Sequence, residues 1–408
     1  MTEMTKRLYY TDTFLHDFEG TVTDVINGDK PAIKLDQTAF YPTSGGQVFD
    51  TGVLRADGGE ARVDQVEETE NGEIVHYINP ADVTNVRPGM KVRGTIDTFR
   101  RRDHMQQHSG QHVLSAAFER LYKMPTASFH MGAETCTIDL ATNGVTNEQI
   151  IRAEELANQV IFENRPVGIR FVGLEEAKTL GLRKLPDVGK DELRLIDISD
   201  FDLCACGGTH VRSTAQIGMI LVRKSEKVKQ GYRVEFVCGN RALKVARKDF
   251  ETLTQAGILY SAGLYEVPAS IRKSLDEIKW AQKQQHKLLE ELAEFWAEKL
   301  SVLAENTGRF KLVKQVFADR DVTFVKLLAQ KLSKHAGVVA LLGASLGQAT
   351  LVFARSGDVD LDVSALIKDV MAKVGGRGGG SKDLAQGGVP EAAKLADLIE
   401  QVAESIRG

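Results

Sequence analysis

The chain has little of what marks secreted, membrane-spanning or nucleic-acid-coating proteins. Only 4 cysteines occur in 408 residues, too few for a disulfide framework. No apolar run approaches the roughly 20 residues of a membrane helix, and the polar stretch Met1–Tyr10 lacks the apolar core of a signal peptide. A net charge of −4 argues against coating nucleic acid through bulk positive charge. We therefore expect a globular protein of a reducing, cytoplasmic setting, with no membrane contact.

The sequence predicts a multidomain α+β protein whose first domain, residues 1–97, is a small antiparallel β-barrel. Six short runs in it alternate apolar and polar residues, as half-buried strands do. Tight-turn sequences such as Asn27-Gly28-Asp29 and Asp57-Gly58-Gly59 separate them. The six runs are 21–26, 32–36, 53–56, 61–66, 74–78 and 92–97.

Residues 98–245 predict an α+β domain. Residues 102–121 carry apolar side chains at helical spacing. Thr146 and Gln149 form a capping box that opens a second helix through Phe162, and Pro166 follows its end. Further strands are expected at 168–172, 193–198, 217–223 and 233–238.

Residues 246–306 predict a helical linker, because 268–304 form one long helical pattern. Its apolar positions approximate a heptad seam that Gln282 and Gln285 weaken. This helix is either an arm within one chain or a dimer helix, and the pattern leaves both open. Residues 307–408 predict an α/β domain with strands at 338–342 and 349–354, helices at 364–374 and 391–406, and a glycine-rich loop at 375–380.

Two short motifs contain the candidate metal ligands of the sequence. His108-Ser109-Gly110-Gln111-His112 places two imidazoles four residues apart on a predicted helix, so both face the same side. Cys206-Gly207-Gly208-Thr209-His210 offers a thiolate and an imidazole from one loop that its glycines allow to turn tightly. Three nitrogens and one sulfur are a ligand set that suits zinc.

The choice of ligands has competitors within the same segments. His104 lies one helical turn before His108, and Cys204 lies two residues before Cys206. A zinc protease is excluded, because Ser109 stands where the His-Glu-x-x-His motif needs its glutamate base. A purely structural zinc stays open, since four protein ligands complete a tetrahedron.

Two basic runs flank the candidate metal site in the sequence. One is Arg100–Arg102; the other spans residues 223–233 with five basic residues, opposed by Glu226 alone. A run of like charge is usually a solvated face of a protein. Two such runs beside a candidate pocket favour a ligand that carries phosphate.

These motifs resemble the editing domain of alanyl-tRNA synthetase and its free-standing relatives, the AlaX proteins. Residues 36–47 are similar to the family's glycine motif in the N-terminal barrel, and residues 101–112 and 128–132 look more like AlaX than like the synthetase. The C-terminal domain resembles the DHH-associated domain, which makes the long form of AlaX the best match. The threonyl-tRNA synthetase editing domain shares the ligand pattern.

The resemblance implies one bound Zn²⁺ and assigns roles to particular residues. The zinc ligands would be His108, His112, Cys206 and His210. The residues that line or lie near the substrate pocket would be Gln111, His130, Thr38, Gly45, Gly46 and Gln47. The residues that contact tRNA would be Arg101, Arg102, Gly376, Arg377, Gly378, Gly379 and Lys382. The group that activates water is not identified by the sequence.

The activity that the resemblance implies is hydrolysis of mischarged tRNA(Ala) in trans, chiefly of seryl-tRNA(Ala) and also of glycyl-tRNA(Ala). An alanine pocket cannot strongly reject serine or glycine, because one small group is worth only about 1–3 kcal/mol. No aminoacylation is expected, because the barrel motif begins almost at Met1. Two alternatives remain: editing of seryl-tRNA(Thr), and a non-catalytic tRNA-binding module with a structural zinc. A homodimer through the helical linker or the C-terminal domain also stays open.

Overall fold

The computed structural model describes residues 4–183, 192–229 and 231–407. It divides into two compact units, one ending at Gln255 and the other beginning at Ala256. Among the described residues, no helix is both long enough and apolar enough to cross a membrane. The two units are described separately below.

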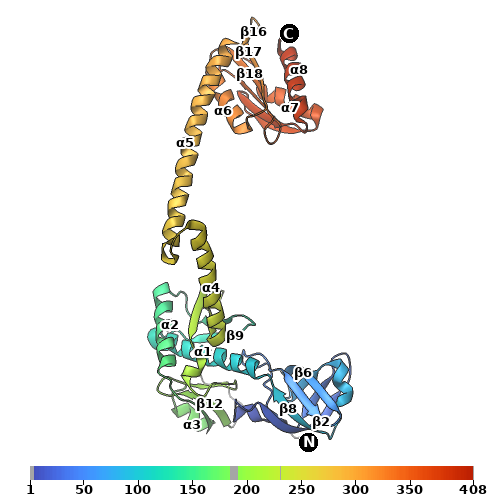
Figure 1. The fold of residues 1–408 in the computed structure, drawn as a ribbon, viewed down its shortest axis with the longest axis vertical. Coiled ribbons are helices and arrows are strands. Elements are labelled where there is room, and N and C mark those ends of the chain that lie inside the picture. Colours follow the sequence, from blue (N-terminus) through green and yellow to red (C-terminus); the bar gives the residue numbers. More distant parts are fainter. Residues whose placement is uncertain (1–3, 184–191, 230, 408) are drawn as a thin grey trace. The chain divides into compact units, whose positions relative to one another are not determined.

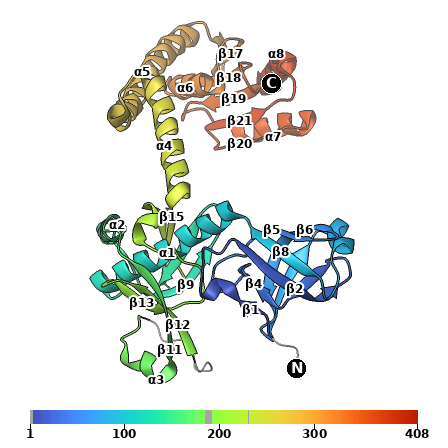
Figure 2. The same cartoon turned by 60° about the horizontal axis from the view of Figure 1, so that its bottom comes forward.

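The first unit begins with a closed six-stranded barrel (Figures 1 and 2). Each of the six predicted runs falls on one of its strands, which confirms the predicted barrel. Its strand order is β2 (Asp17–Ile26), β3 (Ala32–Leu35), β7 (Ile74–Ile78), β6 (Gly59–Glu68), β5 (Gly52–Ala56) and β8 (Lys91–Ile96). The short β1 (Lys6–Arg7) and β4 (Gln37–Thr38) pair in parallel outside it. Alternate residues of the strands, such as Ile33, Leu54 and Val63, fill the barrel core.

A long helix, α1 (Thr98–Tyr122), follows the barrel and is covered on one side by a four-stranded antiparallel sheet. The sheet order is β14 (Ile220–Val228), β15 (Gly231–Cys238), β10 (Cys136–Leu140) and β9 (Thr126–Met131). Gly110 lets α1 approach this sheet, since a Cβ there would meet the Cys238 sulfur at 2.2 Å. The helix is buried almost all round between residues 104 and 118, which include eight polar side chains. Those polar side chains need partners, and they supply the site described below.

The remaining elements of this unit largely match the sequence patterns. Helix α2 (Asn147–Phe162) has the predicted capping box. A three-stranded sheet is formed by β11 (Val167–Gly173), β12 (Glu192–Ile198) and β13 (Asp202–Ala205), with α3 (Leu174–Thr179) after β11. The strand expected at 217–223 starts only at Ile220, because Gly218 has a φ of +88° and ends a 3-10 turn there.

The predicted linker consists of two helices, α4 (Gly239–Tyr260) and α5 (Val267–Val302), joined by a 3-10 turn at Leu264–Glu266. The heptad seam of α5 divides into two parts. In its second part, Leu289, Leu292 and Trp296 pack into the core with α6 (Val322–Leu332). In its first part, Leu275 and Ile278 are each 53% exposed. The second half of α5 therefore packs within the chain, and a dimer through the first half of α5 or through the C-terminal domain stays a prediction.

The second unit is built on a six-stranded sheet. Its order is β16 (Glu305–Asn306), β17 (Lys311–Phe317), β18 (Val338–Ala344), β19 (Thr350–Arg355), β21 (Leu384–Gly388) and β20 (Arg377–Gly380). One core lies against α5 and α6, and the other against α7 (Val363–Val374) and α8 (Leu395–Arg407). These elements agree with the predicted α/β domain.

The prediction of a glycine-rich loop at 375–380 is wrong for most of its length. Gly375 ends α7 in the left-handed conformation, with a φ of +67°. Residues Arg377–Gly380 then form the edge strand β20, which pairs antiparallel with β21. A Cβ at Gly378 would meet the Ile367 side chain at 2.7 Å, so glycine is needed there for packing.

Candidate metal centre

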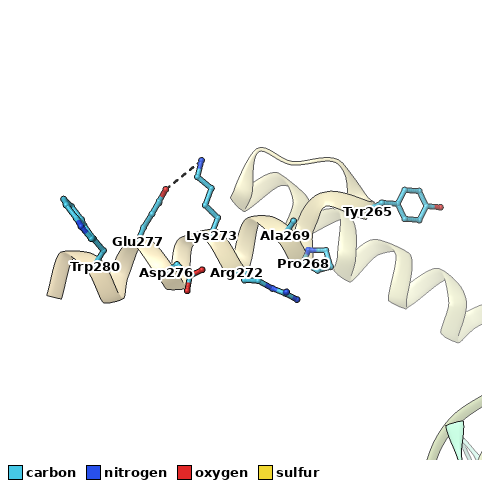
Figure 3. A pocket seen from close by; sticks show the side chains of 8 residues that line it. All are labelled: Tyr265, Pro268, Ala269, Arg272, Lys273, Asp276, Glu277 and Trp280. Atoms are coloured by element: carbon cyan, nitrogen blue, oxygen red, sulfur yellow. Dashed lines mark ion pairs between the residues drawn. The ribbon is translucent and has the colours of Figure 1, made fainter. Parts of the chain in front are cut away.

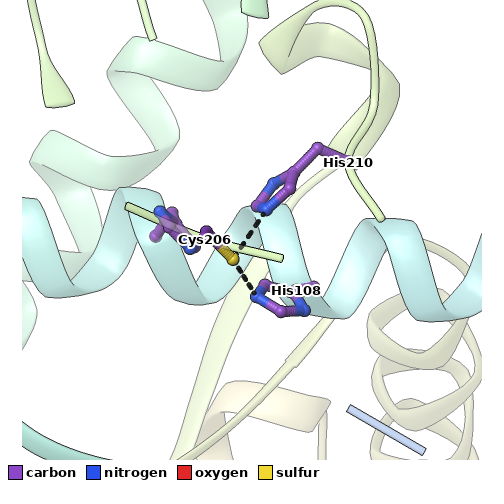
Figure 4. Close-up of side chains that lie close together, drawn as sticks. His108, Cys206 and His210 are labelled. Atoms are coloured by element: carbon purple, nitrogen blue, oxygen red, sulfur yellow. Dashed lines mark hydrogen bonds between the residues drawn. The ribbon is translucent and has the colours of Figure 1, made fainter. Parts of the chain in front are cut away.

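Four side chains from two distant segments converge in the first unit. Helix α1 supplies His108 and His112, and the loop after β13 supplies Cys206 and His210. One ligand atom of each lies within 4.8 Å of every other. The Cys206 Sγ is 3.2 Å from His108 Nε2 and 3.4 Å from His210 Nε2 (Figure 4). A tetrahedral zinc with its usual bond lengths needs a nitrogen–sulfur separation of about 3.6 Å, so the donor set fits this metal.

His104 and Cys204 are outside this cluster, which answers the question that the sequence left open. The His104 side chain is buried and its Nδ1 has no hydrogen-bond partner among the described residues. Burial lowers the pKa of His104 to about 4, and it therefore stays neutral. Cys204 is buried in β13.

Glycine is required in the cysteine-containing loop because the loop lies directly on His108. A Cβ at Gly208 would be 2.2 Å from the His108 ring. A Cβ at Gly207 would contact only the Tyr10 side chain, with the hydroxyl oxygen at 3.6 Å. One of the two glycines is thus needed for a close approach, whereas the other is not.

Each of the three imidazoles is held by a partner at its Nδ1 atom. The partner of His108 is Gln47 Oε1 at 2.8 Å, and that of His112 is Asp202 Oδ2 at 3.2 Å. The partner of His210 is Ser109 Oγ at 3.1 Å. This leaves every Nε2 for the cluster, as outer-shell partners do in metal sites.

The electrostatics of the cluster favour the ligand forms of Cys206 and His210, whereas the pKa of His112 is raised, because the Cys206 thiolate and the Asp202 carboxylate outweigh the effect of its burial. Burial alone would raise the pKa of Cys206, but the three imidazoles outweigh it and hold this pKa well below its usual value. The pKa of His210 is lowered to about 3 by burial. A thiolate beside neutral imidazoles is the state in which these groups bind a metal.

The Asp202 carboxylate has a second partner beside His112. Arg183 donates to it from Nε at 2.7 Å and from Nη2 at 3.0 Å. Burial raises the pKa of Asp202, but the hydrogen bonds from His112 and Arg183 lower it by more than burial raises it. The pKa of Asp202 is therefore below its usual value. Sequence reasoning did not find Asp202, and it placed Ser109 and Thr209 within the two motifs without assigning them contacts to the cluster.

Three family models and an editing protein match this chain. The family model "tRNA synthetases class II (A)" matches residues 1–100, "Threonyl and Alanyl tRNA synthetase second additional domain" matches 193–235, and "DHHA1 domain" matches 311–408. Alanyl-tRNA editing protein AlaX-L of Pyrococcus horikoshii is 31% identical over 421 residues, which cover 99% of this chain and 99% of that protein. The chain belongs to the AlaX family.

Alanine–tRNA ligases are similar to this AlaX chain as well. The ligase of Pyrococcus abyssi is 32% identical over 98% of this chain and 43% of its own length. The chain therefore spans less than half the length of the ligases that it matches. The solved C-Ala domain of the Aquifex aeolicus alanyl-tRNA synthetase matches 26% of this chain and 98% of its own, at 27% identity and a TM-score of 0.24.

The structure brings two of the predicted pocket residues of this AlaX chain, Gln47 and Gly46, to the cluster. Gln47 contacts His108 directly. Gly46 lies against β9, where its carbonyl accepts a hydrogen bond from Met131 N and the neighbouring Phe129 ring is 5.4 Å from that of His108. Gln111, one residue before His112, is buried and donates to Ser115 Oγ at 2.8 Å. Gly45 is an exposed turn residue with a φ of +58°.

Two of the predicted pocket residues point elsewhere. Thr38 is fully buried in the barrel, where its hydroxyl bonds to His76 Nε2 at 2.8 Å. His130 is exposed and pairs with Thr137, whereas its neighbour Phe129 pairs with the buried Ile138. Because side chains alternate along a strand, His130 lies on the face of the sheet away from α1. Both assignments are therefore corrected.

Arg101 is also misassigned, because a tRNA contact needs an accessible side chain. It is 0% exposed, and its Nη2 lies 2.5 Å from Asp50. It also donates to the carbonyls of Thr13 and Ala39, at 2.8 and 2.6 Å. Arg101 therefore joins α1 to the barrel. Arg102, next to it, is exposed.

Three of the five cations in the second basic run form ion pairs, two of them with carboxylates that are distant in the sequence. Arg223 pairs with Asp249, and Arg233 binds Asp139 at 2.7 Å. Lys224 pairs with Glu226 at 2.6 Å. Glu226 is the only acidic residue within the run, and the other two carboxylates come from outside it. These three ion pairs lie at the protein surface, so each of them keeps contact with solvent.

In the second unit, Arg377 and Lys382 are exposed near the ends of β20. Gly376, Gly378 and Gly379 are backbone positions beside or within the β20–β21 ladder. A hollow lies at the start of α5, between Tyr265 and Trp280 (Figure 3). Tyr265 is 98% exposed and the Lys273–Glu277 ion pair faces solvent. No metal-ligand cluster occurs there among the described residues, so it is not the candidate centre.

Proposed function

We propose that the chain is an aminoacyl-tRNA deacylase that hydrolyses the ester of mischarged tRNA(Ala), chiefly seryl-tRNA(Ala) and also glycyl-tRNA(Ala). One observation carries the proposal. A buried cluster of three histidines and a cysteine lies in a chain that is similar to an alanyl-tRNA editing protein over 99% of both. The activity belongs with translation in the cytoplasm.

The metal of the proposed site is Zn²⁺, which suits nitrogen and thiolate ligands in a tetrahedral set. His108, His112, Cys206 and His210 would hold it. When bound, the ion supplies a fixed positive charge that orients or polarises the ester. The residues around it fix the three imidazoles at Nδ1 and exclude water from their other faces.

Selection of serine requires a polar group that pairs with its hydroxyl. Gln111 is suited to this, because it precedes a ligand and its amide nitrogen is already committed to Ser115. Its carbonyl oxygen is thus the atom that it offers to a serine hydroxyl. Alanine would leave that oxygen unpaired, which costs about 1–3 kcal/mol for a buried group. This argument does not extend to glycine.

The contacts with tRNA that we propose use exposed cations. Arg102 lies near the start of α1, and Arg377 and Lys382 lie near the ends of β20. They would bind phosphates of the tRNA body without reading bases.

A panel of aminoacylated tRNAs tests the proposed substrate. The full chain is incubated with seryl-, glycyl- and alanyl-tRNA(Ala) and with seryl-tRNA(Thr). We expect fast hydrolysis of seryl-tRNA(Ala), slower hydrolysis of the glycyl ester and almost none of alanyl-tRNA(Ala). Preference for seryl-tRNA(Thr) would replace alanyl editing by threonyl editing.

One observation favours a second candidate, a tRNA-binding module with a structural zinc. Four protein ligands complete the tetrahedron, and this is typical of structural sites. That candidate predicts tRNA binding without any deacylation above buffer. The same panel, combined with a filter-binding assay of uncharged tRNA(Ala), separates the two.

A further inference from the structure

Gln47 connects the barrel to both ligand-bearing segments. It lies in a tight turn in which Ser44 N and Gln47 O are 3.0 Å apart, and it is 0% exposed. Its Oε1 is 2.8 Å from His108 Nδ1 and 3.1 Å from Thr209 N. Its Nε2 donates to Thr209 Oγ1 at 2.8 Å. One carboxamide thus contacts both α1 and the cysteine-containing loop.

These contacts determine which way the carboxamide faces. The backbone N–H of Thr209 can only donate, so the atom beside it is the oxygen of Gln47. The same oxygen faces His108 Nδ1 and can only accept there. His108 therefore carries its proton on Nδ1, and its Nε2 lone pair faces the Cys206 sulfur at 3.2 Å.

We propose that Gln47 is a positioning residue of the metal centre, which makes the barrel a part of that centre. By fixing the tautomer and ring orientation of His108 and the place of Thr209, it pre-forms the site before the metal binds. The inference rests on the metal site of the proposed function but not on its substrate. It replaces the expected role of Gln47 as a substrate contact.

The test measures zinc affinity of the full chain by competition with a chromophoric chelator. Gln47→Met removes the acceptor at similar volume, and we expect a 10–100-fold loss of affinity, the usual range for an outer-shell partner. Gln47→Glu keeps an acceptor oxygen and should stay near the wild-type affinity. The visible absorption of the Co²⁺-substituted Gln47→Met protein should also shift, since one imidazole is no longer held.

Thr38→Val is the matched control, because it removes a buried barrel hydrogen bond outside the cluster. It should lower stability without changing zinc affinity. If Gln47→Met does not fold, Thr209→Val tests the same link and should weaken zinc binding. Wild-type affinity and an unchanged Co²⁺ spectrum in Gln47→Met would overturn the proposal. Zinc binding by the wild type without deacylation would overturn the proposed function alone.

A different observation concerns an exposed surface formed by the start of α1 and by α4. Phe99 and Phe250 are 62% and 49% exposed. Lys244 Nζ lies 5.7 Å from the centre of the Phe99 ring, and Arg247 Cζ lies 5.7 Å from that of Phe250. An ion pair between Asp103 and Arg241 at 2.7 Å holds the two helices together.

The cations of this aromatic–basic surface are available to a ligand. Within the described ranges, neither Arg102, Lys244 nor Arg247 has a carboxylate within 4.0 Å. By contrast, Arg223 and Arg233 on the β14–β15 hairpin are both paired. Exposed aromatic rings beside unpaired cations form the surface on which single-stranded nucleic acids bind, with bases on the rings and phosphates on the cations.

We infer that this surface binds an unpaired RNA strand, and in the proposed function that strand belongs to the tRNA. The full chain is titrated with uncharged tRNA(Ala) at several salt concentrations. Lys244→Glu combined with Arg247→Glu should weaken binding at least tenfold and reduce the slope of log affinity against log salt by about 1.4–1.8. Phe99→Ala should weaken binding about 5-fold or more, as expected for one lost stacking contact.

Lys227→Glu on the β14–β15 hairpin is the control, because this exposed lysine lies outside the surface. It should leave binding within about twofold of the wild type. The proposal that this surface binds RNA would be refuted if the double variant of Lys244 and Arg247 kept the wild-type tRNA affinity and the wild-type slope of log affinity against log salt. Because the ligand is uncharged tRNA, this result does not depend on whether the chain hydrolyses an ester.

Discussion

Single buried polar residues decide what the first unit can bind. On α1, His108 and His112 reach the cluster, whereas Gln107 bonds the backbone of Cys238 and Arg101 bonds Asp50. All are polar and buried, and their roles differ only through the partner that the fold gives them. Residue type on one helix therefore does not separate ligands from structural groups.

His76 should make the barrel sensitive to acid. Burial lowers its pKa to about 4, below the ordinary 6.5, so the unfolded chain binds the proton more readily. The stabilisation is present above pH 6.5 and is lost as pH falls towards 4, with a slope of up to about 1.4 kcal/mol per pH unit. In His76→Gln, the unfolding free energy should fall less steeply between pH 6.5 and pH 4, by up to about 1.4 kcal/mol per pH unit. Denaturant titrations from pH 7 to pH 4 measure this free energy. An unchanged slope would show that His76 does not titrate on unfolding.

Substitutions of Arg101 and Arg102 should have different effects, the first on protein stability and the second on tRNA binding. Arg101→Leu leaves Asp50 buried without its partner, which should cost about 3–5 kcal/mol of unfolding free energy. Arg102→Ala should change stability by less than about 0.5 kcal/mol, because that side chain is exposed, but it should weaken tRNA binding. Thermal unfolding and filter binding measure the two effects. A stable Arg101→Leu protein with weakened tRNA binding would restore Arg101 as an RNA contact.

At the scale of elements, the site depends on how closely a loop lies on a helix. Helix α1 and the cysteine-containing loop are about a hundred residues apart in sequence, and glycine at 208 permits their contact. Neither element can form the site without the other. The loop is in turn held by Thr13, whose hydroxyl donates to the His210 carbonyl at 2.7 Å.

Gly208→Ala should lose metal binding, whereas Gly207→Ala should keep it. The added Cβ at 208 would overlap the His108 ring at 2.2 Å and push the loop away, but at 207 its nearest neighbour is at 3.6 Å. Zinc content after dialysis against a weak chelator measures the difference. Equal zinc content in both variants would contradict the loop geometry.

The sequence was most predictive for elements with a strong local pattern. All six barrel strands, α1, α2 with its capping box, and α5 follow from alternation, helical spacing or turn residues. The four cluster residues followed from paired motifs. The strand at 377–380 did not, because its glycines have no side chains to alternate and its pairing with β21 is tertiary.

The residues that hold the three histidines could not be predicted from the sequence for a related reason. Gln47, Asp202 and Ser109 lie 61, 90 and 101 residues from the histidines that they hold. No spacing rule connects such positions. Gln47 was selected only through a resemblance, and its contacts show a different partner from the one expected.

At the scale of the whole molecule, similarity to an AlaX protein runs through both units. The first unit holds the candidate metal cluster, and the second carries exposed Arg377 and Lys382. The proposed function therefore needs both, one for chemistry and one for grip on the tRNA. The two roles should separate in kinetics.

Arg377→Glu combined with Lys382→Glu should raise the KM for seryl-tRNA(Ala) with little effect on kcat. The charges act on binding of the tRNA body and not on the ester, so saturating substrate should hide the defect. Lys334→Glu, an exposed lysine after α6, is the control and should leave KM unchanged. A fall in kcat at unchanged KM would remove the proposed role of the second unit.

The central claim is that the buried cluster hydrolyses the seryl ester. Single-turnover hydrolysis of seryl-tRNA(Ala) is measured with the wild-type chain, the chelator-treated chain and Cys206→Ala, while uncharged tRNA binding is followed in parallel. We predict that hydrolysis falls to the level of buffer in the last two and returns in the chelated wild type after zinc is added, with tRNA binding unchanged throughout. Hydrolysis by Cys206→Ala at the wild-type rate would contradict the account.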